Sequence, residues 1–277
     1  MTRVIAIANQ KGGTGKTTTA INLAAGLARG VCHNSPTREQ GSQRVLLVDA
    51  DPQANATMAF LGRPFAAGPR QPGVDTAYEV IMGQTQVGQA IQTLDLPANG
   101  DVPGACLDLL PAHIDLAEAE IELVMAFERE RKMRQALEPI RDSYHYIIID
   151  YPPSLGQLTV NALMAATEVI IPVDPGVFPL AGLGLLRRTI EMVKRVNPDL
   201  HISGVVPSRA SRTTLTRVSR EQIEEAFGDL LLPVIPQRVA VGEGQMVGQD
   251  IFAYDGKGAA GLAFADLVGE VMRRGQE

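Results

Sequence analysis

The hydrophobic positions of this chain gather in short continuous runs, separated by longer segments in which apolar residues recur every three to four positions. The runs are rich in β-branched residues and do not alternate with polar ones. Such runs are typical of strands that are buried on both faces of a parallel sheet. We predict strands over residues 4–8, 45–48, 146–149, 169–173, 202–206 and 231–235.

The segments between these strands have the period of amphipathic helices. We predict helices over residues 16–28, 116–137, 155–166, 180–196 and 215–227. Strands that alternate with helices form βαβ units, so we expect an α/β fold with a doubly wound, mostly parallel sheet and helices on both faces. Polar or Pro/Gly-rich sequence indicates surface loops over residues 32–43, 62–73 and 96–104. None resembles a long interdomain linker, and we predict one domain over residues 1–277.

Composition agrees with a globular protein and excludes several classes. Hydrophobic residues make up 45% of the chain, and no apolar stretch approaches the length of a membrane span. The start of the chain lacks the apolar segment of a signal peptide, so we expect a cytoplasmic protein. Cys32 and Cys106 are too few for a disulfide framework, and the histidines show no metal-ligand spacing. A net charge of −6 excludes a uniformly basic coat but not a local basic patch.

The strongest chemical signal follows the first predicted strand directly. Glycines there let the backbone wrap a polyphosphate with its N–H groups, and the following helix directs its positive end at the anion. Lys16 would reach the β- and γ-phosphates, and the Thr17 hydroxyl would bind Mg²⁺. A ligand-free glycine turn is the alternative, but it does not account for Gly-Lys-Thr-Thr between a strand and a helix. We predict nucleotide binding by Lys11, Gly12, Gly13, Thr14, Gly15, Lys16, Thr17 and Thr18.

This loop departs from the general pattern because Lys11 occupies the usual first glycine position. A lysine on the phosphate-facing turn can bind phosphate oxygens as a compact charge. One interpretation is that geometry keeps Lys11 from the phosphates of its own chain and leaves it free to reach a nucleotide held by a second subunit. The alternative is a solvated surface lysine.

Acidic residues follow two of the predicted strands. Asp49 and Asp51 are two positions apart, so in an extended chain their side chains point to the same side. Ligands of such sheets bind at the carboxyl ends of the strands. We expect one carboxylate to hold the metal shell and the other to orient the attacking water; a turn-forming role before Pro52 is the alternative for Asp51. Asp150 ends an apolar strand and supplies the second acidic site for Mg²⁺.

Together these motifs resemble the ParA/MinD family of P-loop ATPases with a deviant Walker A motif, and most closely its ParA branch. The resemblance covers nearly the whole chain through NQKGGTGKTTTAINLAAGLA, VLLVDADPQANAT, LLPAHIDLAEAEIEL, YIIIDYPPSLGQLTVNAL, IPVDPGVFPLAGLGLLRRTIEMVKRVNP and VIPQRVAVGEGQMVGQDIFAYDGKGAAGLAFADL. No segment precedes the first strand, so we expect no helix-turn-helix module of the kind that longer ParA proteins carry.

The resemblance implies an ATPase that uses ATP and Mg²⁺ and forms a homodimer around two ATP molecules. It assigns catalytic roles to Lys11, which contacts the partner's nucleotide, to Lys16, and to Asp51, which activates water. It assigns the metal site to Thr17, Asp49 and Asp150, and places Pro207 and Pro236 at the nucleotide. The implied ATP-bound dimer binds nonspecific DNA on the nucleoid, and a ParB-like centromere-binding partner stimulates its weak hydrolysis and releases it.

An arginine cluster is the candidate DNA surface. Arginines without acidic neighbours follow the predicted strand that ends near residue 206, and a basic cluster of this kind gives sequence-independent, salt-sensitive affinity for DNA. The candidates are Arg209, Arg212, Arg217, Arg220 and Arg238. A solvated helix face is the alternative.

Departures from the family and rival functions bear on this assignment. Ala54 stands where the family often has glycine, Gln237 where it often has arginine, and residues 208–212 replace a more usual aspartate-containing loop near the adenine.

A ParA-like ATPase for a protein or organelle cargo remains an alternative, as does a MinD-like membrane ATPase. The latter needs a basic amphipathic C-terminal helix, whereas residues 262–274 predict a helix packed on its own domain. The positions of the two cysteines do not suit a redox protein of this fold that shares an iron–sulfur cluster between subunits.

Overall fold

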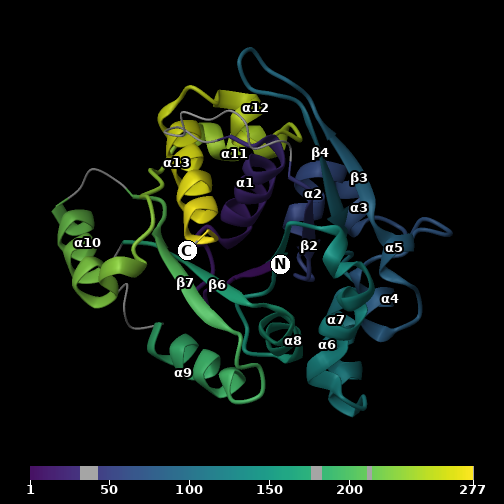
Figure 1. Ribbon diagram of the computed structural model, residues 1–277. Coiled ribbons are helices and arrows are strands. Elements are labelled where there is room, and N and C mark those ends of the chain that lie inside the picture. Colours follow the sequence, from purple (N-terminus) through teal and green to yellow (C-terminus); the bar gives the residue numbers. More distant parts are fainter. Residues whose placement is uncertain (32–42, 176–182, 211–213, 277) are drawn as a thin grey trace.

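A seven-stranded sheet forms the centre of the molecule (Figure 1). The computed structural model describes residues 1–31, 43–175, 183–210 and 214–276, and only the backbone of residues 183 and 214–220. The strands are β1 (Arg3–Ile7), β2 (Val45–Asp49), β3 (Gln92–Leu96), β4 (Ala105–Leu110), β5 (Tyr146–Asp150), β6 (Glu168–Val173) and β7 (His201–Pro207). Their order is β3-β4-β2-β5-β1-β6-β7, and all neighbours pair in parallel except β3 with β4. This is the predicted doubly wound α/β architecture.

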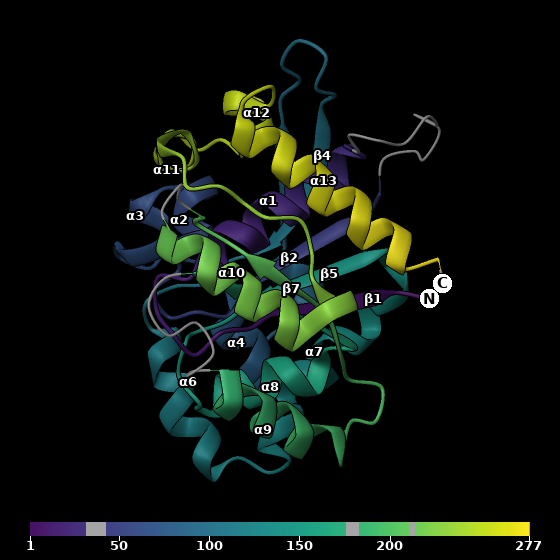
Figure 2. The same ribbon diagram turned by 90° about the vertical axis from the view of Figure 1, so that its left-hand side faces the viewer.

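Helices cover both faces of the sheet (Figures 1 and 2). One face carries α1 (Lys16–Arg29), α11 (Val239–Met246), α12 (Ile251–Asp255) and α13 (Ala259–Arg274). The other carries α4 (Ala77–Met82), α6 (Leu116–Glu122), α7 (Lys132–Leu137), α8 (Gln157–Ala165) and α9 (Leu183–Lys194). The remaining elements are α2 (Asn55–Leu61), α3 (Arg63–Ala67), α5 (Val87–Ala90), η1 (Leu123–Met125), η2 (Arg129–Arg131), η3 (Glu138–Ser143), α10 (Thr214–Phe227) and η4 (Gly228–Leu230).

The core has two halves, one on each face of the sheet. Along β1, Val4 and Ala6 belong to one half, while Ile5 and Ile7 belong to the other. This explains why the strand sequences do not alternate between apolar and polar residues. The buried face of α13 packs in the same half as α1, which confirms the prediction that the C-terminal helix packs on its own domain.

Three predicted elements differ from the structure. The helix expected over residues 116–137 is interrupted, because Glu128 adopts a left-handed backbone with φ 50°. The buried Asn161 of α8 bridges the interruption by accepting from Met133 N (3.0 Å) and donating to Arg129 O (2.7 Å). The loop expected over residues 62–73 contains the short helix α3.

The strand expected over residues 231–235 is an extended segment beside β7, not a strand of the sheet. Leu232 N donates to Val205 O and Ile235 N donates to Pro207 O, each at 2.8 Å. Pro233 and Pro236 have no N–H group, so a continuous ladder cannot form there. The predicted loop over residues 32–43 lies outside the described residues except for its last position.

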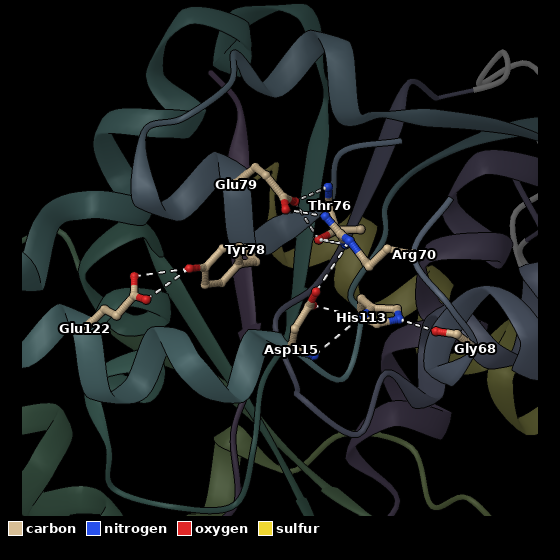
Figure 3. Close-up of polar contacts among 8 residues, drawn as sticks. All are labelled: Gly68, Arg70, Thr76, Tyr78, Glu79, His113, Asp115 and Glu122. Carbon is tan, nitrogen blue, oxygen red and sulfur yellow. Dashed lines mark hydrogen bonds and ion pairs between the residues drawn. The ribbon is translucent and has the colours of Figure 1, made fainter. Parts of the chain in front are cut away.

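A polar network fixes the segment before α4 to the base of α6 (Figure 3). The Arg70 guanidinium donates to Thr76 Oγ1 at 3.0 Å, contacts Glu79, and pairs with Asp115 at 3.4 Å. His113 Nε2 lies 2.9 Å from Gly68 O, and its Nδ1 lies 2.8 Å from Asp115. The start of α6 is therefore held in place beside the carboxyl end of β4.

Candidate functional site

The loop between β1 and α1 wraps an open helix N-terminus. Gly13 and Gly15 have φ angles of 76° and 85°, a left-handed conformation that favours glycine. No side chain caps the first turn of the 14-residue helix α1, and this turn holds no acidic residue. The free N–H groups and the helix dipole therefore favour an anion at this position.

Side-chain hydrogen bonds hold the start of this loop. Asn9 Nδ2 donates to Pro172 O at the end of β6 (2.6 Å), and Asn9 Oδ1 accepts from Lys11 N (2.9 Å). Thr14 Oγ1 donates to Lys11 O at 3.3 Å. Contacts within the protein thus hold the start of the loop in place.

The loop opens into a cleft of about 610 Å³, a size that suits a small-molecule ligand. Gly12, Gly13, Gly15, Lys16, Thr17, Thr18, Asp51 and Pro236 of the predicted residues line it. Asn55, Pro153, Ser208, Arg209, Gln237, Arg238, Val239, Gln245 and Phe264 are among the other lining residues. The predicted phosphate loop and the segment that follows residue 235 therefore face one space.

The other predicted residues lie around the cleft without lining it. Thr14 is buried behind the loop, and Pro207 is buried at the end of β7. Lys11 is exposed to solvent. It is not among the residues that line the cleft, and its contact with a second subunit stays a prediction.

Asp150 is fully buried at the carboxyl end of β5, and neither of its oxygens accepts a hydrogen bond of normal geometry from any residue that the structure describes. Burial, followed by repulsion from Asp49, raises the pKa of Asp150 well above its ordinary value; the nearby Thr17 hydroxyl and Lys16 offset part of this effect. An unpartnered buried carboxylate is unfavourable unless a cation pairs with it. Thr17 and Asp150 are thus oxygen donors of the kind that Mg²⁺ prefers.

Asp49 lies directly beside Asp150 in the sheet register, but its surroundings differ. Its Oδ2 accepts from Thr57 N at 2.8 Å and Thr57 Oγ1 at 2.7 Å, and its Oδ1 accepts from Asp51 N at 3.2 Å. Burial raises the pKa of Asp49 to about 6, although the Thr57 hydrogen bonds oppose the shift. Thr57 Oγ1 in turn accepts from Ala112 N, so Asp49 links β2 to α2 and to the end of β4.

Asp51 and Lys16 both line the cleft. Asp51 is 5% exposed and accepts from Gln53 N at 2.9 Å. Burial raises the pKa of Asp51, whereas Gln53 and Lys16 lower it. Burial also lowers the pKa of Lys16, with Asp150 and Asp51 acting in the opposite direction. A cation and a carboxylate thus influence each other at the wall of one cleft.

The arginines predicted to bind DNA do not form one described patch. Arg209 and Arg238 line the cleft, where Arg209 Nη1 donates to Gly13 O and Arg238 Nη1 donates to Gln237 O. Arg212 lies outside the described residues. Arg217 and Arg220 lie on α10, whose side chains at these positions are also outside the description.

Sequence reasoning missed several residues that support the site. Ser208 Oγ donates to Thr14 O at 2.5 Å, and Gln245 Nε2 donates to Thr18 Oγ1 at 3.4 Å. Glu120 of α6 accepts from Gln157 N (2.7 Å) and Leu158 N (3.3 Å) at the start of α8. These contacts join segments that are far apart in the sequence, so no local sequence pattern predicts them.

Two broader features limit what the site can be. Within the described part of the chain, no group of three or more His, Cys, Asp or Glu side chains could hold a metal ion by itself. A cation at Thr17 and Asp150 would therefore need further ligands from a nucleotide and water. Among the described residues, no helix is both long and apolar enough to cross a membrane.

Fold and loop together define the class. The sheet is mostly parallel, a Gly-rich loop ending in Gly-Lys-Thr joins β1 to the first helix, and the neighbouring strand β5 ends in a buried acid; this is the architecture of a P-loop ATPase. The AAA domain family matches residues 2–202. Solved structures agree: cobyrinic acid a,c-diamide synthase from Mycobacterium smegmatis with bound ADP and magnesium is 33% identical, with a TM-score of 0.78 over 100% of this chain and 96% of that one.

Curated relatives narrow the class further. The chromosome partitioning protein ParA of Caulobacter vibrioides is 41% identical over 98% of this chain and 94% of its own length. The sporulation initiation inhibitor protein Soj of Bacillus subtilis is 39% identical over 99% of this chain and 100% of its own length. McdA of Cyanothece, at 22% identity and a TM-score of 0.79, shares the fold. The chain belongs to the AAA domain family and, within it, to the ParA/Soj group of partitioning ATPases.

Proposed function

We propose that this protein binds ATP with Mg²⁺ and hydrolyses it to time a DNA-partitioning cycle. In this cycle the ATP-bound homodimer binds nonspecific DNA on the nucleoid, and a ParB-like or equivalent adaptor stimulates hydrolysis and releases the protein. The observation that carries the proposal is Asp150, a fully buried carboxyl group whose raised pKa is offset only by the nearby Thr17 hydroxyl and Lys16. Relatives with the ParA name and an ADP–magnesium complex of a 33% identical protein support it.

Each predicted residue has a role in this reaction. The loop N–H groups and Lys16 would hold the phosphate oxygens, and Thr17 and Asp150 would hold Mg²⁺, which supplies positive charge to the phosphates when bound. Asp51 would orient the attacking water and accept its proton, because its carboxylate faces the cleft beside Lys16. Lys11, exposed outside its own cleft, would reach the nucleotide of the partner subunit.

Asp49 has a different role in this scheme from the other two aspartates. Its oxygens already accept hydrogen bonds from Thr57 and Asp51, so its support for the metal site would be indirect, through the placement of Asp51. Pro236 lines the cleft and would contact the nucleotide directly, whereas the buried Pro207 would act by positioning Ser208.

Binding to random-sequence duplex DNA with ATP, ADP or no nucleotide, across a salt series, tests the proposal. We expect binding only with ATP and weakening with salt, since phosphate contacts release counterions. Lys16→Ala should abolish ATP binding and hence DNA binding. A wild-type protein that dimerises with ATP but ignores DNA at every salt concentration would contradict the DNA step, and liposomes and candidate cargo proteins would then be tested.

A further inference from the structure

Two successive carbonyl groups of the phosphate loop accept hydrogen bonds from two successive residues of a distant segment. Arg209 Nη1 donates to Gly13 O at 2.5 Å, and Ser208 Oγ donates to Thr14 O at 2.5 Å. Ser208 and Arg209 directly follow β7. Ser208 lies 194 residues after Thr14 in the sequence. Both side chains line the same cleft as the loop.

Peptide geometry gives these contacts a consequence for the loop N–H groups. In a trans peptide unit the C=O and the following N–H point in opposite directions, and no cis peptide bond occurs among the described residues. Fixing Gly13 O therefore fixes the direction of Thr14 N–H, and fixing Thr14 O fixes that of Gly15 N–H. With the two carbonyls turned toward Ser208 and Arg209, both N–H groups are turned away from these residues.

The backbone of Arg209 is held in an unfavourable conformation to make this contact. Its φ angle is 57°, in the left-handed region that a non-glycine residue rarely adopts. Ser208 N donates to Val173 O (2.8 Å) on one side. Ala210 N donates to Ile235 O (3.1 Å) on the other, and Ala210 O accepts from Gln237 N (3.0 Å). Hydrogen bonds on both sides thus impose a conformation that places the guanidinium against the loop.

We propose that Ser208 and Arg209 form a clamp that orients the phosphate-binding N–H groups of Thr14 and Gly15. Arg209 is then a positioning residue of the nucleotide site instead of a member of the DNA-binding patch that the sequence predicts. The inference rests on the proposed function, because the anion that the clamp serves is the polyphosphate of ATP. Because the clamp acts on the loop backbone that binds the phosphates, it serves ADP as well as ATP.

Arg209→Gly is the informative variant because glycine adopts the left-handed backbone without strain, so the variant removes the side chain and its guanidinium without disturbing the backbone. Arg209→Lys restores a single charged donor, and Ser208→Ala removes the second half of the clamp. Arg195→Gly is the matched control. This exposed arginine follows α9 and precedes the amino end of β7, whereas Ser208 and Arg209 follow its carboxyl end. Affinities for Mg²⁺–ADP, a nonhydrolysable ATP analogue and adenosine are measured by calorimetry and competition, together with unfolding of the nucleotide-free protein.

We expect Arg209→Gly to weaken ADP and ATP-analogue binding about tenfold, the effect of losing a hydrogen bond from a charged donor. Ser208→Ala should weaken both about fivefold, as for a neutral hydrogen bond. Adenosine affinity should not change in either variant, because adenosine has no phosphate. Arg209→Lys should recover most of the loss, and Arg195→Gly should match wild type.

Other outcomes overturn the clamp. Wild-type ADP affinity in both Arg209→Gly and Ser208→Ala would do so, as would an equal loss of adenosine affinity, which would indicate general distortion. Unchanged nucleotide affinity with weaker DNA binding at saturating nucleotide would return Arg209 to the DNA surface. A wild-type chain that binds neither ADP nor the analogue would overturn the proposed function itself, and that result is visible before any variant is compared.

Discussion

At the scale of single residues, three aspartates near the carboxyl ends of β2 and β5 have different surroundings. Asp49 is buried with its oxygens bonded to Thr57 and Asp51, whereas Asp150 is buried without a hydrogen bond of normal geometry from the described residues. Asp51 lies at the cleft wall with one backbone donor. The cost of burying a charge is least compensated at Asp150, where only the nearby Thr17 hydroxyl and Lys16 offset it.

This cost predicts a pH dependence for the nucleotide-free protein. In the unfolded chain an aspartate ionises near pH 4, whereas burial and the Asp49 charge raise the pKa of Asp150 in the folded chain. The folded state therefore binds more protons between these two pKa values, and the free energy of unfolding falls as pH rises through this window. Asp49, whose pKa is raised to about 6, contributes in the same direction.

Asp150→Asn should remove the part of this fall in the free energy of unfolding that Asp150 causes. We expect the variant to be more stable than wild type by about 1–3 kcal/mol at pH 8, with little difference at pH 4, as measured by urea unfolding without nucleotide or Mg²⁺. Asp142→Asn, at an exposed position in η3, is the control and should change neither value. Equal stability of wild type and Asp150→Asn at pH 8 would mean that Asp150 is not an unpaired buried charge.

Asp51→Ala should separate binding from hydrolysis. We expect ATP affinity within about threefold of wild type, because the phosphates are held by the loop and Lys16, and a hydrolysis rate lower by about 100-fold or more, the usual effect of losing a general base. Phosphate release under saturating ATP measures the rate, and Asp142→Ala serves as control. Hydrolysis at the wild-type rate would remove Asp51 from this role.

How much of the site follows from the sequence depends on whether its residues are neighbours in the chain. The loop from Lys11 to Thr18 and the strand ends at Asp49 and Asp150 obey local patterns, and the structure places them around one cleft. Ser208 and Arg209 reach the loop only through the order of the strands, so their role had no local signal. The sequence predicts DNA binding for Arg209 because it lies among other arginines, and that prediction contains no sign of its contact with Gly13 O.

Ala54 illustrates a different limit. It stands where the family often has glycine, and its φ angle is 49°. The family pattern therefore reports a left-handed backbone at the start of α2, and this chain keeps that backbone with an alanine. The conformation could be inferred from the family but not from the alanine, which by itself favours a helix interior.

At the scale of elements, the sequence predicts best where an element is buried on both faces or has a regular period. The parallel strands β1, β2, β5, β6 and β7 and helices α1, α8 and α9 were found this way. The antiparallel edge hairpin β3–β4 was missed, since its strands carry alternating polar residues and its Pro/Gly-rich connection was taken for an isolated loop. The break in the predicted helix over residues 116–137 depends on Asn161, a residue of another helix.

A contact between α6 and α8 yields a prediction at this scale. Helix α8 follows the segment after Asp150 and has no N-cap side chain of its own, and Glu120 supplies the acceptors instead. Glu120→Ala should lower the free energy of unfolding by about 1–2 kcal/mol, the usual effect of losing an N-cap. It should also raise hydrogen exchange at the start of α8. Glu118→Ala, on the same helix but exposed, is the matched control and should have little effect; equal effects of both would rule out the cap.

At the scale of the whole molecule, the net charge would make the proposed DNA binding depend on assembly. A chain with a net charge of −6 is repelled by DNA overall, so binding requires a local basic patch. A single patch of a few cations gives weak, salt-sensitive affinity, whereas two patches on one dimer bind the same duplex together and gain from effective concentration. Nucleotide-dependent dimerisation would thus switch DNA binding without any change in the patch itself.

Lys11→Ala tests this coupling because Lys11 is exposed and does not line the cleft of its own chain. We expect monomeric nucleotide affinity within about threefold of wild type, since the phosphate contacts within the chain remain. The ATP-dependent dimer should be lost in sedimentation experiments, and DNA binding should be lost with it, although no DNA contact has been removed. Lys132→Ala, at the start of α7, controls for the loss of one positive charge. A Lys11→Ala protein that stays monomeric with ATP yet binds DNA with the wild-type salt dependence would show that one subunit suffices, and assembly would then not be the switch.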